Sequence, residues 1–265
     1  MNSPFRLAAS SYLNSAPLIW SFLHGSHRGS VEFVEAVPSR CARLLAESTV
    51  EGALIPVIEY QRIEGGSLVS NVCVGSRKEV LSVVLVSRDK QLEQIRSVAL
   101  DESSRTSATL VKVIFREFLD REPEWTTTAP NVEEMLDKYD AALIIGDPGM
   151  GFRRRGLNVW DMAVLWKQYT GLGFVFAMWM VRDEAIERAR KVDFSGARDE
   201  GVAHLAEIVA SYKDKIPMPV EDLRNYLTEN IVFNVDESME KGLRLYFELA
   251  FKHKLIDSVK ALKYI

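Results

Sequence analysis

The feature that most constrains the fold is an alternation of short apolar runs with amphipathic helical segments, with almost no spare loop between them. Apolar or β-branched runs at 5–9, 31–37 and 53–55 predict strands. Polar residues and a proline at 14–17 predict the start of one helix, and Pro38 begins another. Strands that alternate with helices in this way are typical of α/β proteins with a largely parallel sheet.

The same alternation resumes further along the chain, after an apolar run at 80–86. Strands are predicted at 97–100, 141–145 and 172–181, and a helix with one apolar side is predicted at 106–119. Apolar residues at helical spacing then continue into the C-terminal tail. The pattern indicates two α/β units followed by helices.

The two long apolar runs look like crossings between two lobes, because no linker or internal repeat separates independent halves. We expect one lobe to hold both termini, residues 1–86 with 178–265, and an inserted lobe of residues 87–177. Paired α/β lobes place ligands in the cleft between them, at the carboxyl ends of the strands. The predicted site is therefore an interdomain cleft.

Composition limits the partners. The chain has 265 residues, 47% of them hydrophobic and 26% charged, and a net charge of -4, which gives no reason to expect a nucleic-acid partner. The most apolar stretch is about half of the ~20 residues that span a membrane, and the N-terminus lacks a secretory pattern. With Cys41 and Cys73 interpreted as free thiols, we expect a cytoplasmic protein with no membrane partner.

Most motifs that announce an enzyme class are absent. The sequence has no GxGxxG, GxxxxGK[ST], GxSxG or HExxH. Histidines stand alone on predicted helices or at their ends, where they are more often structural than catalytic; they are His24, His27, His204 and His253. We therefore expect no metal site and no cofactor.

Two polar turns between a strand and a helix are candidate sites. In the turn 10–15, Asn14 or Ser15 either caps the next helix or binds a small polar ligand. In the turn 101–107, amides and hydroxyls at a helix start, together with Arg105, favour a site for a carboxylate over simple capping.

Three weaker candidates leave both alternatives open. Asp147 follows a predicted strand and either caps the next helix or lies at the site. Ser82 is the polar residue of an apolar run, so its hydroxyl bonds either the backbone or a ligand. The glycines and aromatic residues of 166–174 belong to the core, or form a hinge close to the ligand.

Several of these segments together resemble one family, the chorismate dehydratases of the futalosine pathway to menaquinone. The resemblance covers two thirds of the chain, in the family's order, and rests on Ser11-Tyr12-Leu13-Asn14, Ala53-Leu54-Ile55-Pro56, Ser104-Arg105-Thr106-Ser107, Ile145-Gly146-Asp147 and Thr170-Gly171-Leu172. Ala16 and Gly173 depart from the family's usual lysine and proline. The sister dihydroxynaphthoate synthases open with a different motif.

The resemblance implies an α/β type II periplasmic-binding-protein-like fold and an enzyme that dehydrates chorismate in the cytoplasm. It implies Asn14 as the catalytic residue, with the general base either a protein side chain or a carboxylate of the substrate. The substrate-binding residues that it implies are Ser11, Tyr12, Ile55, Ser82, Ser104, Arg105, Thr106, Ser107, Asp147 and Phe174.

A different class of function is also compatible with these residues. A non-catalytic binding protein or sensor for an aromatic or dicarboxylic acid would have the same two lobes, because fold does not determine function. Incubation with chorismate separates the two hypotheses. The sequence does not define the oligomeric state.

Overall fold

The computed structural model describes residues 4–265, whose longer strands form two five-stranded sheets. Sheet A has the order β2-β1-β3-β10-β4, with the strands β1 (Phe5–Ala9), β2 (Val31–Glu35), β3 (Gly52–Pro56), β4 (Gly66–Ser76) and β10 (Phe174–Arg182). Strands β1, β2 and β3 are parallel, as expected for consecutive βα units. Strand β10 returns from the other lobe and runs antiparallel to β3 and β4.

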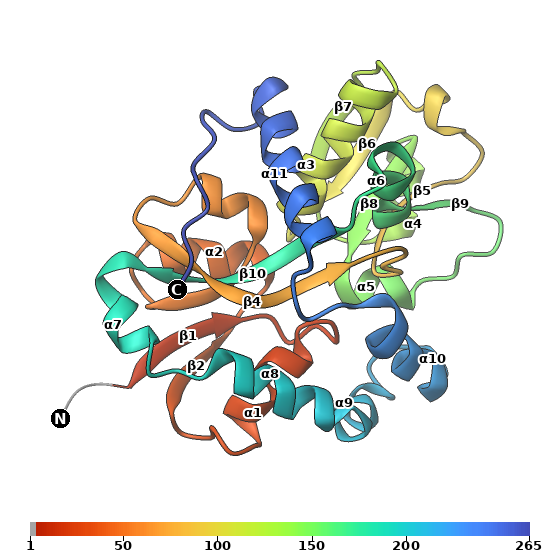
Figure 1. Ribbon diagram of the computed structural model, residues 1–265. Helices are drawn as coiled ribbons and strands as arrows, with labels where there is room; N and C mark the ends of the chain where they lie inside the picture. Colours follow the sequence, from red (N-terminus) through yellow and green to blue (C-terminus); the bar gives the residue numbers. More distant parts are fainter. Residues whose placement is uncertain (1–3) are drawn as a thin grey trace.

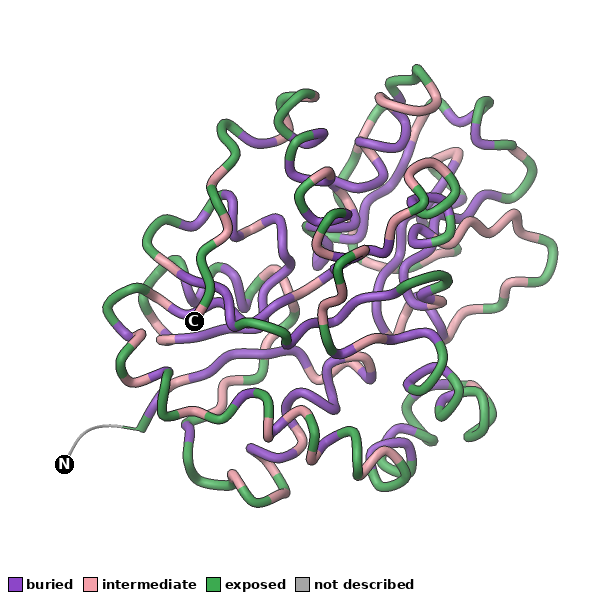
Figure 2. Tube along the Cα trace, in the orientation of Figure 1, coloured by how far each residue is buried: buried purple, intermediate pink, exposed green. Residues whose placement is uncertain are grey.

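Sheet B has the order β7-β6-β8-β5-β9 and forms the second lobe. Its strands are β5 (Val83–Ser87), β6 (Ser97–Asp101), β7 (Glu124–Thr128), β8 (Ala141–Ile145) and β9 (Asn158–Asp161). Figure 1 shows the two sheets side by side, and Figure 2 shows that their central strands are buried. The expected two-lobed α/β architecture is confirmed.

The chain passes between the sheets a few residues before the expected boundaries. Strand β5 lies in sheet B and β10 lies in sheet A, so the connecting segments are 77–82 and 171–173. The carboxylate of Asp161 fixes the first segment, because it accepts the backbone N–H groups of Val80 and Leu81 at 2.9 and 2.6 Å. Gly171 has a φ of 74°, which suits the left-handed turn at the second.

Helices pack on both sheets. Sheet A is flanked by α1 (Ala16–Leu23), α2 (Pro38–Ala46), η1 (Val57–Gln61), η4 (Asp183–Ala185), α7 (Ile186–Ala189), α8 (Phe194–Ala203) and α9 (Leu205–Tyr212). Sheet B carries η2 (Leu92–Gln94), α3 (Thr106–Val113), the π-turn η3 (Ile114–Phe118), α4 (Val132–Lys138), α5 (Gly146–Gly151) and α6 (Met162–Thr170). The predicted helix 106–119 is thus confirmed, with a change to π geometry at its end.

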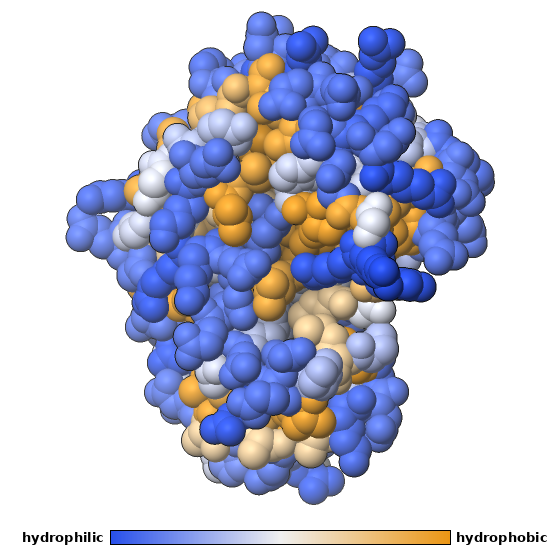
Figure 3. Space-filling view, turned by 90° about the vertical axis from the view of Figure 1, so that its right-hand side faces the viewer, coloured by the Kyte–Doolittle hydropathy of each residue, from blue (hydrophilic) through white to orange (hydrophobic). Residues whose placement is uncertain are grey.

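One face of sheet B has a small apolar cluster of its own. A separate apolar cluster that includes Val84, Val86 and Ile144 packs mainly under the short helix α4 and partly buried side chains such as Phe152 and Leu157. Figure 3, which views the molecule from the right-hand side of Figure 1, shows hydrophobic residues among hydrophilic ones on that side.

The C-terminal tail joins the two lobes. It contains α10 (Val220–Asn225), the π-turn η5 (Tyr226–Asn230) and α11 (Glu237–Lys252). Helix α11 is capped by Asp236 and packs against both β10 and α3, so it touches both lobes (Figure 1). Its apolar residues Leu243, Tyr246, Phe247 and Ala250, which recur at helical spacing, are all buried as predicted.

Candidate active site

A cavity of about 60 Å³ lies between the carboxyl ends of strands from both sheets. Its polar wall comes from the turns that follow β1 and β6, and its apolar wall comes from strands of both sheets. The lining residues are Ser10, Tyr12, Asn14, Ser15, Pro38, Leu54, Pro56, Val74, Val83, Ser104, Arg105, Thr106, Ser107, Ile145, Gly146, Phe176 and Ala177. Such a wall suits a flat ligand with apolar faces and charged or polar edges.

In the first polar turn, the side chains that line the cavity hydrogen-bond one another. Ser15 is the N-cap residue of α1, but its hydroxyl donates to Oδ1 of Asn14 at 3.1 Å instead of capping the helix backbone. The hydroxyls of Ser10 and Ser15 are 3.0 Å apart. Asn14 is therefore held from one side by a chain of buried hydroxyls.

The second polar turn is the amino end of helix α3. Its first residues, Thr106 and Ser107, are buried and line the cavity, and Arg105 at the N-cap position is exposed at its edge. The hydroxyl of Ser104 accepts the N–H of Ala108 at 3.1 Å. The positive end of the helix, the neighbouring hydroxyls and the guanidinium together suit a carboxylate.

A buried acid supports this turn from below. The carboxylate of Asp101 accepts the N–H and the hydroxyl of Ser103 at 2.8 and 2.6 Å, and the N–H of Ile145 at 3.3 Å. Burial raises the pKa of Asp101, and the bonds from Ser103 and Ile145 oppose that shift. Asp101 thus fixes the anion-binding turn against the end of β8.

The two lobes touch directly beside the cavity. Gly146 has a φ of 65°, and an added Cβ there would lie 2.5 Å from the ring of Tyr12. The next residue, Asp147, does not cap the helix but accepts the backbone N–H of Leu13 at 2.9 Å. Further along the cleft, Ile58 donates its N–H to the hydroxyl of Thr106 at 3.3 Å. The lobes are closed on each other.

Burial dominates the electrostatics of these contacts. Burial raises the pKa of Asp147 to about 6, against the lowering effect of the Leu13 bond and of Lys215. Burial also raises the pKa of Tyr12, against the lowering effect of Ser103 in the opposite lobe. Tyr12 therefore stays protonated at neutral pH.

Six of the predicted site residues line this one cavity, and the structure brings them together from both lobes. They are Tyr12, Asn14, Ser104, Arg105, Thr106 and Ser107. The amino end of α3 and Asn14 line the same space, although they are distant in sequence.

The other predicted residues lie outside the described cavity wall. Ser11 points its hydroxyl at Glu35. Ile55 is fully buried, while its strand neighbours Leu54 and Pro56 line the cavity, because side chains alternate along a strand. Phe174 packs on Trp166 and Tyr246 in the core.

The remaining two predicted site residues, Asp147 and Ser82, lie next to residues that line the cavity. Asp147 joins the lobes through Leu13. Ser82 is fully buried directly before the lining residue Val83, and its hydroxyl accepts a hydrogen bond from Tyr226 at 2.7 Å. The sequence left two possible partners for the Ser82 hydroxyl, the backbone and a ligand. The structure shows a third, the side chain of Tyr226 in the C-terminal tail.

Sequence reasoning missed several lining residues. Phe176 reaches the cavity because the register of β10 shifts between Val175 and Ala177, and such irregularities redirect side chains. Val74 lies on β4, a strand that was not predicted. The alternation of side chains along a strand would have identified Leu54. Tyr226, which bonds Ser82 beside the cavity, lies in the distant tail, and no pattern near it in the sequence indicates this contact.

The structure places both departures from the family's usual residues and explains the one at Gly173. Ala16 is buried at the start of α1. Gly173 donates its N–H to the hydroxyl of Ser238 at 3.0 Å, a bond that proline cannot make. An added Cβ at Gly173 would also lie 2.7 Å from the side chain of Met239, so this glycine lets α11 pack closely.

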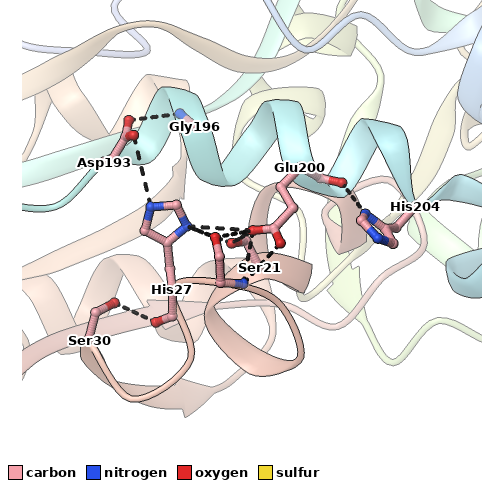
Figure 4. A network of polar contacts seen from close by, with 8 residues as sticks. Ser21, His27, Ser30, Asp193, Gly196, Glu200 and His204 are labelled. Atoms are coloured by element: carbon pink, nitrogen blue, oxygen red, sulfur yellow. Dashed lines mark hydrogen bonds and ion pairs between the residues drawn. The ribbon is translucent and has the colours of Figure 1, made fainter.

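A serine, a histidine and acids meet at another place, shown in Figure 4, where they connect α1 with α8. The hydroxyl of Ser21 is 2.7 Å from Nδ1 of His27, and Nε2 of His27 is 3.9 Å from Asp193. Ser21 is fully buried and also donates to Glu200, so it is closed to a substrate. This network is a structural tie, as predicted for lone histidines.

Two negative findings concern the described residues only. Within residues 4–265, no group of three or more His, Cys, Asp or Glu side chains could hold a metal ion. In the same range, every helix is too short or too polar to cross a membrane.

The fold and the enclosed site define a class: a two-lobed, periplasmic-binding-protein-like α/β protein. A protein of Archaeoglobus fulgidus superposes with a TM-score of 0.78 at 18% identity, covering 96% of this chain and 98% of that one. The periplasmic aliphatic sulphonate binding protein SsuA of Escherichia coli superposes with a TM-score of 0.66 at 13% identity, covering 100% and 94%. These likenesses show the fold.

The sequence gives the narrower assignment. The family model described as menaquinone biosynthesis matches residues 5–252, and the chain belongs to this family. It is 27% identical over 264 residues to the chorismate dehydratase of Thermus thermophilus, with 92% of this chain and 94% of that one covered. The chorismate dehydratase of Campylobacter jejuni is 25% identical, with 89% and 88% covered.

Proposed function

We propose that this protein is a chorismate dehydratase, a hydro-lyase that converts chorismate to 3-enolpyruvyl-benzoate and water in menaquinone biosynthesis. One observation carries the proposal. The amino end of α3 and the amide of Asn14 face the same small cavity from opposite lobes, with apolar side chains between them. Chorismate is a cyclohexadiene with one carboxylate on the ring and a second on the side chain, which suits this arrangement.

The ring carboxylate binds at the amino end of α3. The helix dipole, the hydroxyls of Ser104, Thr106 and Ser107, and the guanidinium of Arg105 supply positive potential and donors there. Apolar residues such as Leu54 and Phe176 cover the faces of the ring. The side-chain carboxylate then lies toward Asn14.

The chemistry is a loss of water in two steps. The carbon that bears the enolpyruvyl ether first loses its proton, and the electron pair spreads through the diene into the ring carboxylate. The hydroxyl leaves the neighbouring carbon and takes up the proton as water, so that the ring becomes aromatic. Donors fixed around the ring carboxylate stabilise the transition state more than the bound substrate.

The base is a carboxylate of the substrate itself. Among the described residues that line the cavity, none carries a carboxylate or an imidazole, and Tyr12 stays protonated. The side-chain carboxylate of chorismate, held by Asn14 against the ring, is the group in reach of the proton. Asn14 therefore positions this carboxylate, and its contribution is one of proximity.

Substrate entry requires the lobes to separate. The cavity volume of about 60 Å³ lies well below the ~300 Å³ at which ligand pockets begin. The contacts of Gly146 and Asp147 with the other lobe close the cavity, and the connecting segments 77–82 and 171–173 are the hinge. Closure excludes water, which strengthens the electrostatic interactions inside.

The reaction takes place in the cytoplasm in this proposal. Both cysteines, Cys41 and Cys73, are buried free thiols, which suits a reducing compartment. Chorismate is the only partner that the proposal needs.

Incubation of the purified protein with chorismate tests the proposal. We expect the ultraviolet absorbance of the product and a mass lower by one water. A rise in melting temperature without product would instead show the non-catalytic binding protein considered above. Absence of both product and stabilisation would contradict both functions.

A further inference from the structure

Leu81 lies in a strained turn at the first crossing between the lobes. The N–H of Ser82 donates to the carbonyl of Val80 at 2.6 Å, and Leu81 between them has a φ of 58°. A hydrogen bond over three residues, with a positive φ at the middle one, defines a rare and strained kind of γ-turn. Because leucine has a Cβ, this conformation is unfavourable for it and persists only where the surrounding structure holds it.

The carboxylate of Asp161 holds this turn. Its Oδ2 atom accepts the N–H groups of Val80 and Leu81 at 2.9 and 2.6 Å. Its Oδ1 atom caps helix α6, where it accepts the N–H groups of Ala163 and Val164 at 2.9 and 3.1 Å. One oxygen thus binds a helix of the lobe of sheet B, and the other binds the crossing segment to that lobe.

Arg154 ties the same turn to helix α5. Its Nη2 atom donates to the carbonyl of Leu81 at 2.7 Å and to the carbonyl of Gly149 in α5 at 3.0 Å. Ser82 packs on this helix as well, because an added Cβ at Gly149 would lie 2.7 Å from the carbonyl oxygen of Ser82. The turn and α5 therefore form one packed unit.

This unit contributes to the cavity and to the contact between the lobes. Val83, two residues after Leu81, lines the cavity, and so does Gly146, the first residue of α5. Gly146 also packs on Tyr12, and Asp147 accepts a backbone N–H of the other lobe. A change in the turn would therefore move part of the cavity wall and the surface on which the lobes close.

We propose that Asp161 is a positioning residue of the active site, which holds Leu81 in the strained turn and so places the start of β5 and helix α5 at the cavity. Asp161 lies outside the described cavity wall, so it acts through these two elements. The inference rests on the proposed function, because its kinetic test uses chorismate.

The variant Asp161→Asn tests the proposal. Asparagine has one acceptor oxygen in place of two, so it cannot accept all four N–H groups. Because asparagine is a good helix cap, we expect its oxygen to stay on α6 and the crossing segment to lose its acceptor. At pH 8, where Asp161 with its pKa of about 6 is ionised, kcat/KM for chorismate should fall about tenfold, the effect of a lost hydrogen bond to a charged group.

A second substitution separates positioning from a general loss of stability. Glycine adopts a positive φ without strain, so adding Leu81→Gly to Asp161→Asn should restore kcat/KM about fivefold, the effect of strain at one left-handed residue. Leu81→Ala is the matched control, because alanine also shortens the side chain but keeps the Cβ that causes the strain. In the Asp161→Asn background, Leu81→Ala should restore nothing.

Asp193→Asn is the control for replacing a helix-capping carboxylate by an amide. Asp193 caps α8 through the N–H of Gly196 at 2.8 Å, and neither residue lines the cavity. This variant should keep the kcat/KM of the parent.

NMR spectra of the ligand-free protein give a measurement that does not depend on turnover. In Asp161→Asn, the backbone amide signals of Val80 and Leu81 should shift, because both N–H groups lose the carboxylate. The amide signals of Gly146 and Gly149 should shift with them, because α5 is tied to the turn. Asp193→Asn should leave all four signals in place.

Each outcome decides the inference. The positioning role would be overturned by parent-like kcat/KM in Asp161→Asn, by equal kcat/KM for glycine and alanine at position 81 in that background, or by unshifted α5 signals. If the parent protein fails to turn over chorismate, the proposed function fails, and the NMR comparison still decides whether Asp161 holds the turn and α5 in place.

Discussion

The backbone N–H of Leu13 donates a 2.9 Å hydrogen bond to Oδ1 of Asp147, across 134 residues of sequence. The bond joins the turn after β1 in one lobe to the start of α5 in the other. It lies beside the stacking of Tyr12 on Gly146, next to the cavity. Because both contacts join the two lobes, substitutions at Asp147 and Gly146 should change how the lobes close.

Asp147 should make stability depend on pH. Its pKa rises from the ordinary 3.8 to about 6 in the folded protein, so the folded state binds this proton more tightly than the unfolded chain does. The stabilisation is complete below pH 3.8 and is lost as the pH rises through about 6. The free energy of unfolding of the parent should therefore fall between pH 4 and pH 7. This fall should exceed the fall in Asp147→Asn by at most about 3 kcal/mol.

Urea titrations at several pH values measure this difference. The other acids are common to both proteins, so their effects cancel in the comparison. Parallel pH profiles for the parent and Asp147→Asn would contradict the assignment.

Gly146→Ala should disturb closure as well as stability. Its φ of 65° is unfavourable for alanine, and the new Cβ would lie 2.5 Å from the ring of Tyr12. Gly156→Ala is the matched control, because Gly156 has a φ of 81° and no atom within 4 Å of an added Cβ. Each variant should lose about 1–2 kcal/mol through backbone strain.

Only Gly146→Ala should also weaken substrate binding, since only this residue lies between the lobes. Calorimetric titration with a non-reacting analogue of chorismate compares the two variants. Equal affinities in both would show that the Tyr12 contact does not govern closure.

Arg105→Ala should weaken substrate binding more than turnover. The guanidinium lies at the edge of the cavity beside the amino end of α3. Loss of a hydrogen bond between charged groups predicts a rise in KM of about 10- to 100-fold. Steady-state kinetics measure this change, with the exposed Arg121 changed to alanine as the control for lost positive charge. A similar KM in both variants would place the carboxylate elsewhere.

Asn14→Ala should lower kcat by about 100- to 1000-fold, with a much smaller effect on KM, because its role is to hold the reacting carboxylate. Asn131→Ala is a suitable control: Asn131 caps α4, so its loss costs about 1 kcal/mol of stability without touching the cavity. Product formation at saturating chorismate measures the effect. Parent-like turnover by Asn14→Ala would remove Asn14 from the mechanism.

Local sequence patterns predicted much of the fold. The strands 5–9 and 141–145 have the predicted bounds, because short apolar runs between polar turns have one favourable conformation. The long strand β4 was missed, since Ser70 and Asn71 interrupt its apolar pattern. Its pairing with β10 makes this segment a strand, and no local pattern encodes that pairing.

The sequence by itself determined the βα units, the two polar turns and the family likeness, since each depends on residues close together in the chain. Tertiary structure alone decided that Asp147 binds Leu13 and that Tyr226 binds Ser82. A buried polar group bonds whichever partner the folded chain brings within about 3 Å. That choice depends on the path of the whole chain.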